Sequence, residues 1–191
     1  MVFRRQSSRY HPTTGCYQIP WETPLGNVAL QVVRGETPFE QTTQLPIQDA
    51  MPADALGAPI HQDFSALVDP FHPAQPGEIV SFYLTGLGAV SPPVVDGTPG
   101  PTSPLALLAN PVAVLQAGGA SQPPGEVLDV LYQGLAPGFV GIYQMNARLP
   151  AHVIRNPLLP NGGPVSVSLA IHYSGGRSVT LSPVWMTPNQ N

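Results

Sequence analysis

The chain has 191 residues and a net charge of −4, with 9% charged residues, 25 prolines and 19 glycines. All seven basic residues are arginines, and they form no basic stripe of the kind that nucleic-acid binding needs. No apolar run approaches the roughly 20 residues of a membrane span, so we expect neither nucleic-acid binding nor membrane insertion. Short apolar runs between frequent prolines and glycines instead favour an all-β protein with many turns.

The first part of the chain offers little pattern. Residues 1–16 contain three of the arginines and no strand signal, so we expect them to be disordered. No apolar run follows those arginines, so no signal peptide is predicted. Cys16 is the only cysteine, which excludes an internal disulfide and a cysteine-based zinc site within one chain.

Residues 17–48 are predicted to form part of a β unit. Strand-like runs at 28–33 and 42–47 flank a glycine turn. So few strands leave unpaired edges, and they must pack on the rest of the chain or pair with a partner, which could be a second copy in a homodimer. Residues 49–75, rich in Pro and Ala, are predicted to be a linker.

Residues 76–187 are predicted to form one complete β unit. Strand-like runs lie at 79–85, 112–116, 127–132, 142–149, 165–173 and 178–186. The last two runs flank Ser174-Gly175-Gly176-Arg177, and the period-2 alternation in 165–173 is typical of a half-buried strand, so they predict a hairpin. The only helix candidate is 103–109, which covers about two turns.

An internal repeat supports this division. Residues 28–47 align with residues 165–184 without gaps. Both segments read as strand, glycine turn and strand, and Pro46 aligns with Pro183. The chain therefore looks like the end of one β unit, a spacer and a complete second unit.

Three segments carry a resemblance to a known family. They are YQIPWETPLGNVALQVV (17–33), PGEIVSFYLTGLGAVSPPV (76–94) and GLAPGFVGIYQMNARLP (134–150). They resemble a family of uncharacterised bacterial C-terminal domains, which lie at the ends of long secreted proteins and consist of two Ig-like, TIG-type repeats. Two departures are a missing front half of the first repeat and a longer loop at 156–161.

The resemblance implies an all-β fold, an Ig-like (TIG-type) β-sandwich in which one complete repeat follows a truncated repeat. It also implies an extracellular or cell-surface setting, and it implies no catalytic residues, because none are known for the family.

Some segments of the sequence resemble parts of known chemical sites. Gly86-Leu87-Gly88 after a strand is half of a dinucleotide fingerprint, but Pro92 and Pro93 stop any helix that would hold a pyrophosphate. A metal cluster could be drawn from His61, Asp63, Asp69 and His72, but a solvated turn explains these residues better. Glu78 and Glu126 each open a strand and are expected to face water, and His152 and His172 to lie at the surface. No cofactor, metal or catalytic site is therefore predicted.

Aromatic side chains leave a binding role open. Strand parity places Val80, Phe82 and Leu84 on one face and Tyr83 on the other, and it also places Tyr143 outward. The main hypothesis is a non-catalytic structural or protein-interaction module at the C-terminal end of a secreted or cell-surface bacterial protein. The alternative is a carbohydrate-binding accessory module of an extracellular hydrolase, with Tyr83 and Tyr143 as ligand contacts.

Overall fold

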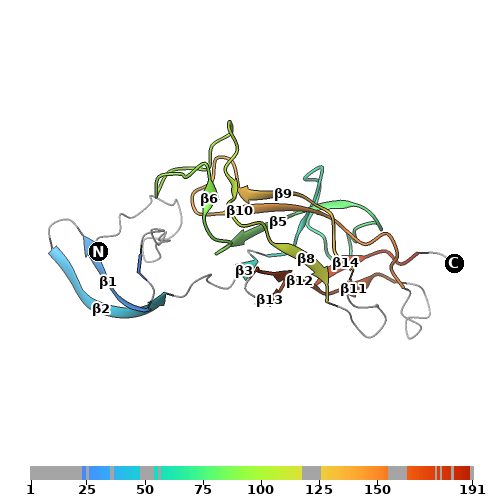
Figure 1. Ribbon diagram of the computed structural model, residues 1–191. Coiled ribbons are helices and arrows are strands. Elements are labelled where there is room, and N and C mark those ends of the chain that lie inside the picture. Colours follow the sequence, from blue (N-terminus) through green and yellow to red (C-terminus); the bar gives the residue numbers. More distant parts are fainter. Residues whose placement is uncertain are drawn as a thin grey trace.

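Every regular element in the described part of the chain is a β-strand. The computed structural model describes residues 23–24, 26–34, 37–47, 54–55, 57–117, 126–154, 163–174, 176, 178–181 and 183–189. The predictions for residues 1–16 and for the start of the 17–33 motif lie outside them. The all-β prediction is confirmed for the described residues, and the strands form antiparallel sheets in a sandwich-like arrangement (Figure 1).

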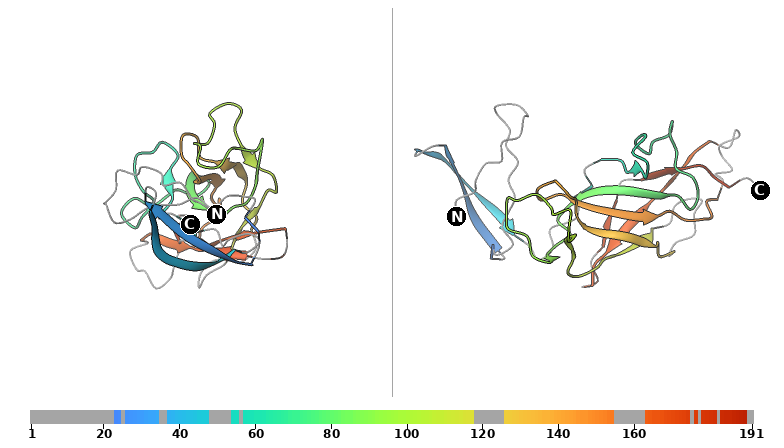
Figure 2. Two further views of the ribbon diagram at one scale, coloured as in Figure 1. Left: turned by 90° about the vertical axis from the view of Figure 1, so that its left-hand side faces the viewer. Right: turned by 90° about the horizontal axis from the view of Figure 1, so that it is seen from above.

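The first two strands form a hairpin of their own. Strands β1 (Gly26–Arg34) and β2 (Thr37–Ile47) are antiparallel, from Gly26 opposite Ile47 to Arg34 opposite Thr37. Among the described residues this is a two-stranded sheet, and it lies apart from the other sheets in Figure 1 and in the right view of Figure 2. The predicted pair of strands is therefore present. No other strand in the described part of the chain pairs with it.

The larger sheet forms one layer of the sandwich. Its strand order is β3-β5-β10-β9-β7-β6, and β4 also pairs with β5. The strands are β3 (Asp54–Ala55), β4 (Ile60–His61), β5 (Ile79–Thr85), β6 (Val90–Ser91), β7 (Leu107–Leu108), β9 (Val130–Leu135) and β10 (Tyr143–Arg148). The sandwich thus includes β3 and β4, which the sequence assigned to the linker 49–75.

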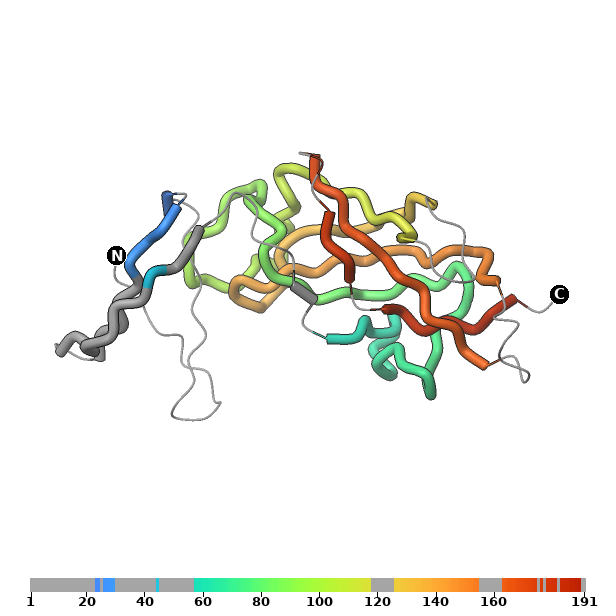
Figure 3. The backbone as a smooth tube through the Cα atoms, turned by 90° about the horizontal axis from the view of Figure 1, so that it is seen from below, coloured from blue at the N-terminus to red at the C-terminus, as the bar shows by residue number. Residues whose placement is uncertain are grey.

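The second layer faces this sheet and consists of two small groups of strands. One has the order β13-β12-β8, with β8 (Ala113–Gln116), β12 (Leu169–His172) and β13 (Ser178–Thr180). The other pairs β11 (Val165–Val167) with β14 (Val184–Met186). Because Val165 lies opposite Met186 and His172 opposite Ser178, the predicted hairpin is confirmed. Figure 3 shows these strands crossing over the first layer.

One apolar core fills the space between the layers. Val80, Phe82 and Leu84 of β5 point into it, as their spacing predicts. The same cluster takes side chains from both layers, including Met145, Val114, Leu169, Ile171, Val184 and Met186. Removal of these side chains from water is the main source of stability for such a sandwich.

The helix candidate at 103–109 does not form a helix, because this segment contains β7 instead. Leu107 pairs with both Ser91 and Gly134, and the Leu135 N–H donates to the Ala106 carbonyl at 2.9 Å. Short helical signals are weak, and contacts with distant strands override them.

A single stretch of chain connects the two layers at their edge. It pairs with β5 through β4 in the first layer, and Ala74 then forms a parallel bridge with Met186 in the second. The Ala74 N–H donates to the Trp185 carbonyl and the Thr187 N–H to the Ala74 carbonyl, each at 2.9 Å. The intervening β4–β5 loop, residues 62–78, is therefore anchored to both layers.

Candidate functional site

The β4–β5 loop is a hydrogen-bonded structure in its own right. The carboxylate of Asp63 accepts from the Ser65 N–H at 2.9 Å, and that of Asp69 accepts from the N–H groups of Phe71 and His72 at 2.8 and 2.7 Å. The Val68 N–H donates to the Pro59 carbonyl at 2.8 Å, and the Val68 side chain is fully buried. These bonds order the turns within the loop.

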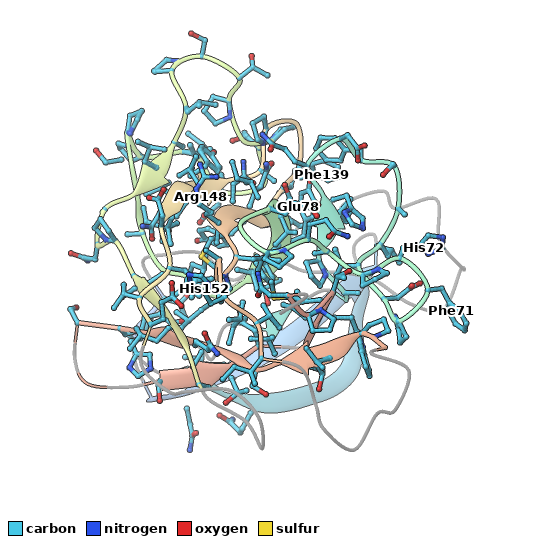
Figure 4. All side chains as sticks on the ribbon, turned by 90° about the vertical axis from the view of Figure 1, so that its right-hand side faces the viewer. Phe71, His72, Glu78, Phe139, Arg148 and His152 are labelled. Carbon is cyan, nitrogen blue, oxygen red and sulfur yellow. The ribbon has the colours of Figure 1, made fainter. Side chains whose placement is uncertain are left out.

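The same loop presents large apolar side chains to water. Phe64, Leu67 and Phe71 are 61%, 52% and 87% exposed. Phe64 has a φ of 59°, a value that costs energy for a bulky residue. Figure 4 shows Phe71 and His72 at the periphery of the molecule, directed away from the sheets. Exposed apolar side chains on a rigid loop are typical of a contact surface for another molecule.

Hydrogen bonds also stabilise the negative charges of this loop. Those from Ser65 lower the pKa of Asp63, and those from the N–H groups of His72 and Phe71 lower the pKa of Asp69. Both carboxylates are therefore ionised at neutral pH. The apolar residues of the loop are accompanied by two negative charges.

His61 and Glu78 form an ion pair at the base of the loop. His61 Nδ1 lies 2.5 Å from Glu78 Oε1, and the other carboxylate oxygen accepts from the Gln75 N–H at 2.8 Å. The side chains of His61 and Glu78 are only 15% and 23% exposed. The expectation that Glu78 faces water is therefore wrong, because the chain folds back and places His61 beside it.

A second candidate surface lies on the outer face of the first layer. Asn146 of β10 accepts hydrogen bonds from Ser81 and Gln144, each at 3.0 Å. Tyr83, beside Gln144 in the register, is half-buried, and its ring centroid is 6.2 Å from that of the exposed Phe139. Tyr83 thus lies on the outer face, as predicted, with an aromatic neighbour and an amide network beside it.

The outward placement of Tyr143 is wrong. Its side chain is 2% exposed and belongs to the core, and its hydroxyl donates to the Gly88 carbonyl at 2.5 Å. A tyrosine can be buried when its hydroxyl finds such an acceptor. The buried ring is not available to a saccharide at the surface, so of the two predicted contacts only Tyr83 lies where a ligand could reach it.

The glycines that resemble a phosphate loop have a structural role. Gly86 and Gly88 have φ values of 75° and 104°, a region that glycine enters without steric cost. The chain then enters β6 rather than a helix, so no helix N-terminus is present to hold a phosphate.

The remaining polar candidates do not form a shared site. No group of three or more His, Cys, Asp or Glu side chains suited to a metal ion occurs in the described part of the chain. His152 and His172 are exposed, as expected. Within the described residues, no helix is long and apolar enough to cross a membrane.

Comparison of the chain with models of known families, with curated proteins and with solved structures finds no match. The sequence reading passed over Phe64, Leu67 and Phe71, although a signal was present. Turn-forming Asp63 and Asp69-Pro70 flank Phe64 and Leu67, and Phe71 follows Pro70 directly, without any strand period. Aromatic residues within such a turn-rich segment could have been taken as exposed.

Proposed function

We propose that residues 57–189 form an Ig-like sandwich of the TIG type that acts as a non-catalytic interaction module. The fold assignment is supported by the strand order. An Ig sandwich places strands A, B, E and D in one sheet and C, F and G in the other. Here β4 pairs with β5, and β5, β10 and β9 are successive neighbours in the first layer. In the second layer, β8, β12 and β13 are neighbours.

The exposed apolar residues of the β4–β5 loop are the observation that carries the function. A rigid loop that holds two phenylalanines and a leucine in water gains free energy when a partner covers them. The ionised Asp63 and Asp69 favour a protein partner whose apolar pocket is bordered by Lys or Arg. The extracellular or cell-surface setting is part of the proposal and rests on the sequence resemblance.

Replacement of Phe71 with serine is expected to weaken capture of this partner at least about tenfold, because a large apolar contact is lost. At 87% exposure Phe71 contributes little to folding, so the free energy of unfolding should change by no more than about 0.5 kcal/mol. The measurement is quantitative capture from the extracellular fraction, with captured proteins identified by mass spectrometry.

The matched control is Val95→Ser, which removes an apolar side chain that is 76% exposed on another loop. A partner of this surface is captured by wild type and by Val95→Ser but not by Phe71→Ser. Equal capture by all three proteins would contradict the proposal.

The alternative function, a carbohydrate-binding module, is favoured by the surface around Tyr83. Aromatic rings and side-chain amides together are the groups that bind sugars, and Tyr83, Phe139, Gln144 and Asn146 supply them. Under this alternative, Tyr83→Ala is expected to abolish retention on cellulose, xylan or chitin, whereas Phe71→Ser retains it. No retention of wild type on any polysaccharide would eliminate the alternative.

The β1–β2 hairpin is the proposed site of homodimer formation. A two-stranded sheet is marginal alone and leaves backbone groups unpaired at both edges. A dimer formed there would be lost when residues 1–48 are deleted. Sedimentation of the full chain and of the deletion variant would measure this loss.

A further inference from the structure

The ring of His61 lies between two hydrogen-bond acceptors. Nδ1 lies 2.5 Å from Glu78 Oε1, and Nε2 lies 3.2 Å from the His72 carbonyl oxygen. Neither a carboxylate nor a carbonyl oxygen donates a hydrogen bond, whereas a neutral imidazole carries only one N–H. Only the doubly protonated imidazolium can donate to both.

The charged groups around the ring favour the same protonation state. Partial burial by itself lowers the pKa of His61, but the hydrogen bonds to Glu78 and His72, with the charges of Glu78 and Asp63, outweigh it and raise the pKa above its ordinary value. On the loop itself, Asp69 is hydrogen-bonded to His72. Across the sheet edge, Arg148 donates to the Gly77 carbonyl at 3.3 Å.

These two contacts join parts of the chain that are otherwise separate. His61 ends β4, Glu78 precedes β5, and His72 lies on the far side of the loop between them. Glu78 also accepts a hydrogen bond from the Gln75 N–H. Gln75 follows Ala74, which pairs with Met186 of the second layer. The protonated His61 ring therefore holds the start of the loop against its end at Glu78 and against His72 within it.

We propose that the β4–β5 loop is a pH-sensitive device in which the His61 imidazolium, bound to Glu78 and to the His72 carbonyl, locks the loop onto the sheet edge. Loss of the proton removes one of the two donors and the attraction to Glu78, and the loop opens. This lock does not depend on which partner the loop binds. It would, however, make Phe64, Leu67 and Phe71 less ordered in alkaline solution.

The direction of the effect follows from linkage. A histidine whose pKa is raised in the folded state stabilises that state fully below its unfolded pKa of about 6.5. This stabilisation is lost as the pH rises through the folded-state pKa. The loop should therefore be closed in mildly acidic solution and open more often above neutral pH.

Amide hydrogen exchange followed by NMR tests the lock in the full chain. The reporters are the N–H groups of His61, Phe64 and Val68, each of which forms a hydrogen bond between the loop and residues 59–61. The reference is the N–H of Leu128, which bonds to Val114 in the sandwich. Between about pH 5.5 and 8.5, where ordinary carboxyl groups stay ionised, loop protection corrected for intrinsic exchange should fall several-fold. Protection of Leu128 should change much less.

His61→Asn supplies the decisive comparison, because the side-chain amide of asparagine can donate a hydrogen bond to Glu78 at every pH. Its loop protection should not vary over this range, whereas His152→Asn, at an exposed histidine, should behave as wild type. A pH-independent loop in wild type, or an equal fall in His61→Asn, would overturn the proposal. If His61→Asn does not fold, the pKa of His61 measured by NMR in wild type decides, and a value at or below 6.5 rejects the lock.

Discussion

Replacement of Gly134 with alanine is expected to destabilise the sandwich by about 2–4 kcal/mol. A Cβ at this position would lie 2.3 Å from the Ala106 carbonyl oxygen and 3.0 Å from Leu107 Cα. Both are backbone atoms, so no side-chain rotation relieves the overlap. β7 would have to move away from β9, and the bond from the Leu135 N–H to Ala106 would be lost.

The matched control for this substitution is Gly163→Ala. A Cβ on Gly163 would meet no atom within 4 Å, so its free energy of unfolding should change by no more than about 0.5 kcal/mol. Urea denaturation of both variants gives the comparison. Equal stability of Gly134→Ala and wild type would show that β7 does not approach β9 as closely as described.

Replacement of Gln116 with methionine is expected to stabilise the protein by about 1–3 kcal/mol. Gln116 is only 2% exposed, and neither its Oε1 nor its Nε2 has a hydrogen-bond partner in the described part of the chain. Burial of an amide without partners is unfavourable, whereas methionine has a similar length and no strong polar group. The gain would appear as a higher urea midpoint with an unchanged slope.

Gln144→Met is the control for this gain. Gln144 lies on the outer face, and its amide donates to Asn146 at 3.0 Å. The same substitution there removes a hydrogen bond, buries nothing, and should be neutral or destabilising by about 1 kcal/mol. Should Gln116→Met also destabilise, the buried amide must have a partner, such as a water molecule.

The elements that sequence predicted well are those with a strong local pattern. Alternation in residues 165–173 gives the buried face of Val165, Val167, Leu169 and Ile171, and the glycine turn that follows sets the hairpin. The pairing of β5 with β10 is different, because no local rule states which distant strands become neighbours. The sequence pattern therefore indicates strands but not their order in the sheets.

The errors at the candidate sites share a cause. Tyr143 is buried because the Gly88 carbonyl is available to its hydroxyl, and Glu78 is shielded because His61 returns to it across 17 residues. β7 forms where the sequence offered a weak helix candidate, because Gly134 leaves room for Ala106. Each of these depends on a contact between residues distant in sequence, which composition and periodicity do not encode.

The parallel bridge between Ala74 and Met186 determines how this sandwich would respond to mechanical force. Once β3 and β4 have detached from β5, tension along the chain pulls Ala74 toward the N-terminal side and Met186 toward the C-terminal side, so it acts along the direction of the two paired segments. The two 2.9 Å hydrogen bonds there are then loaded in shear and share the force, instead of opening one after another as at the end of a hairpin. Resistance to pulling would thus concentrate at the strand edge beside the β4–β5 loop.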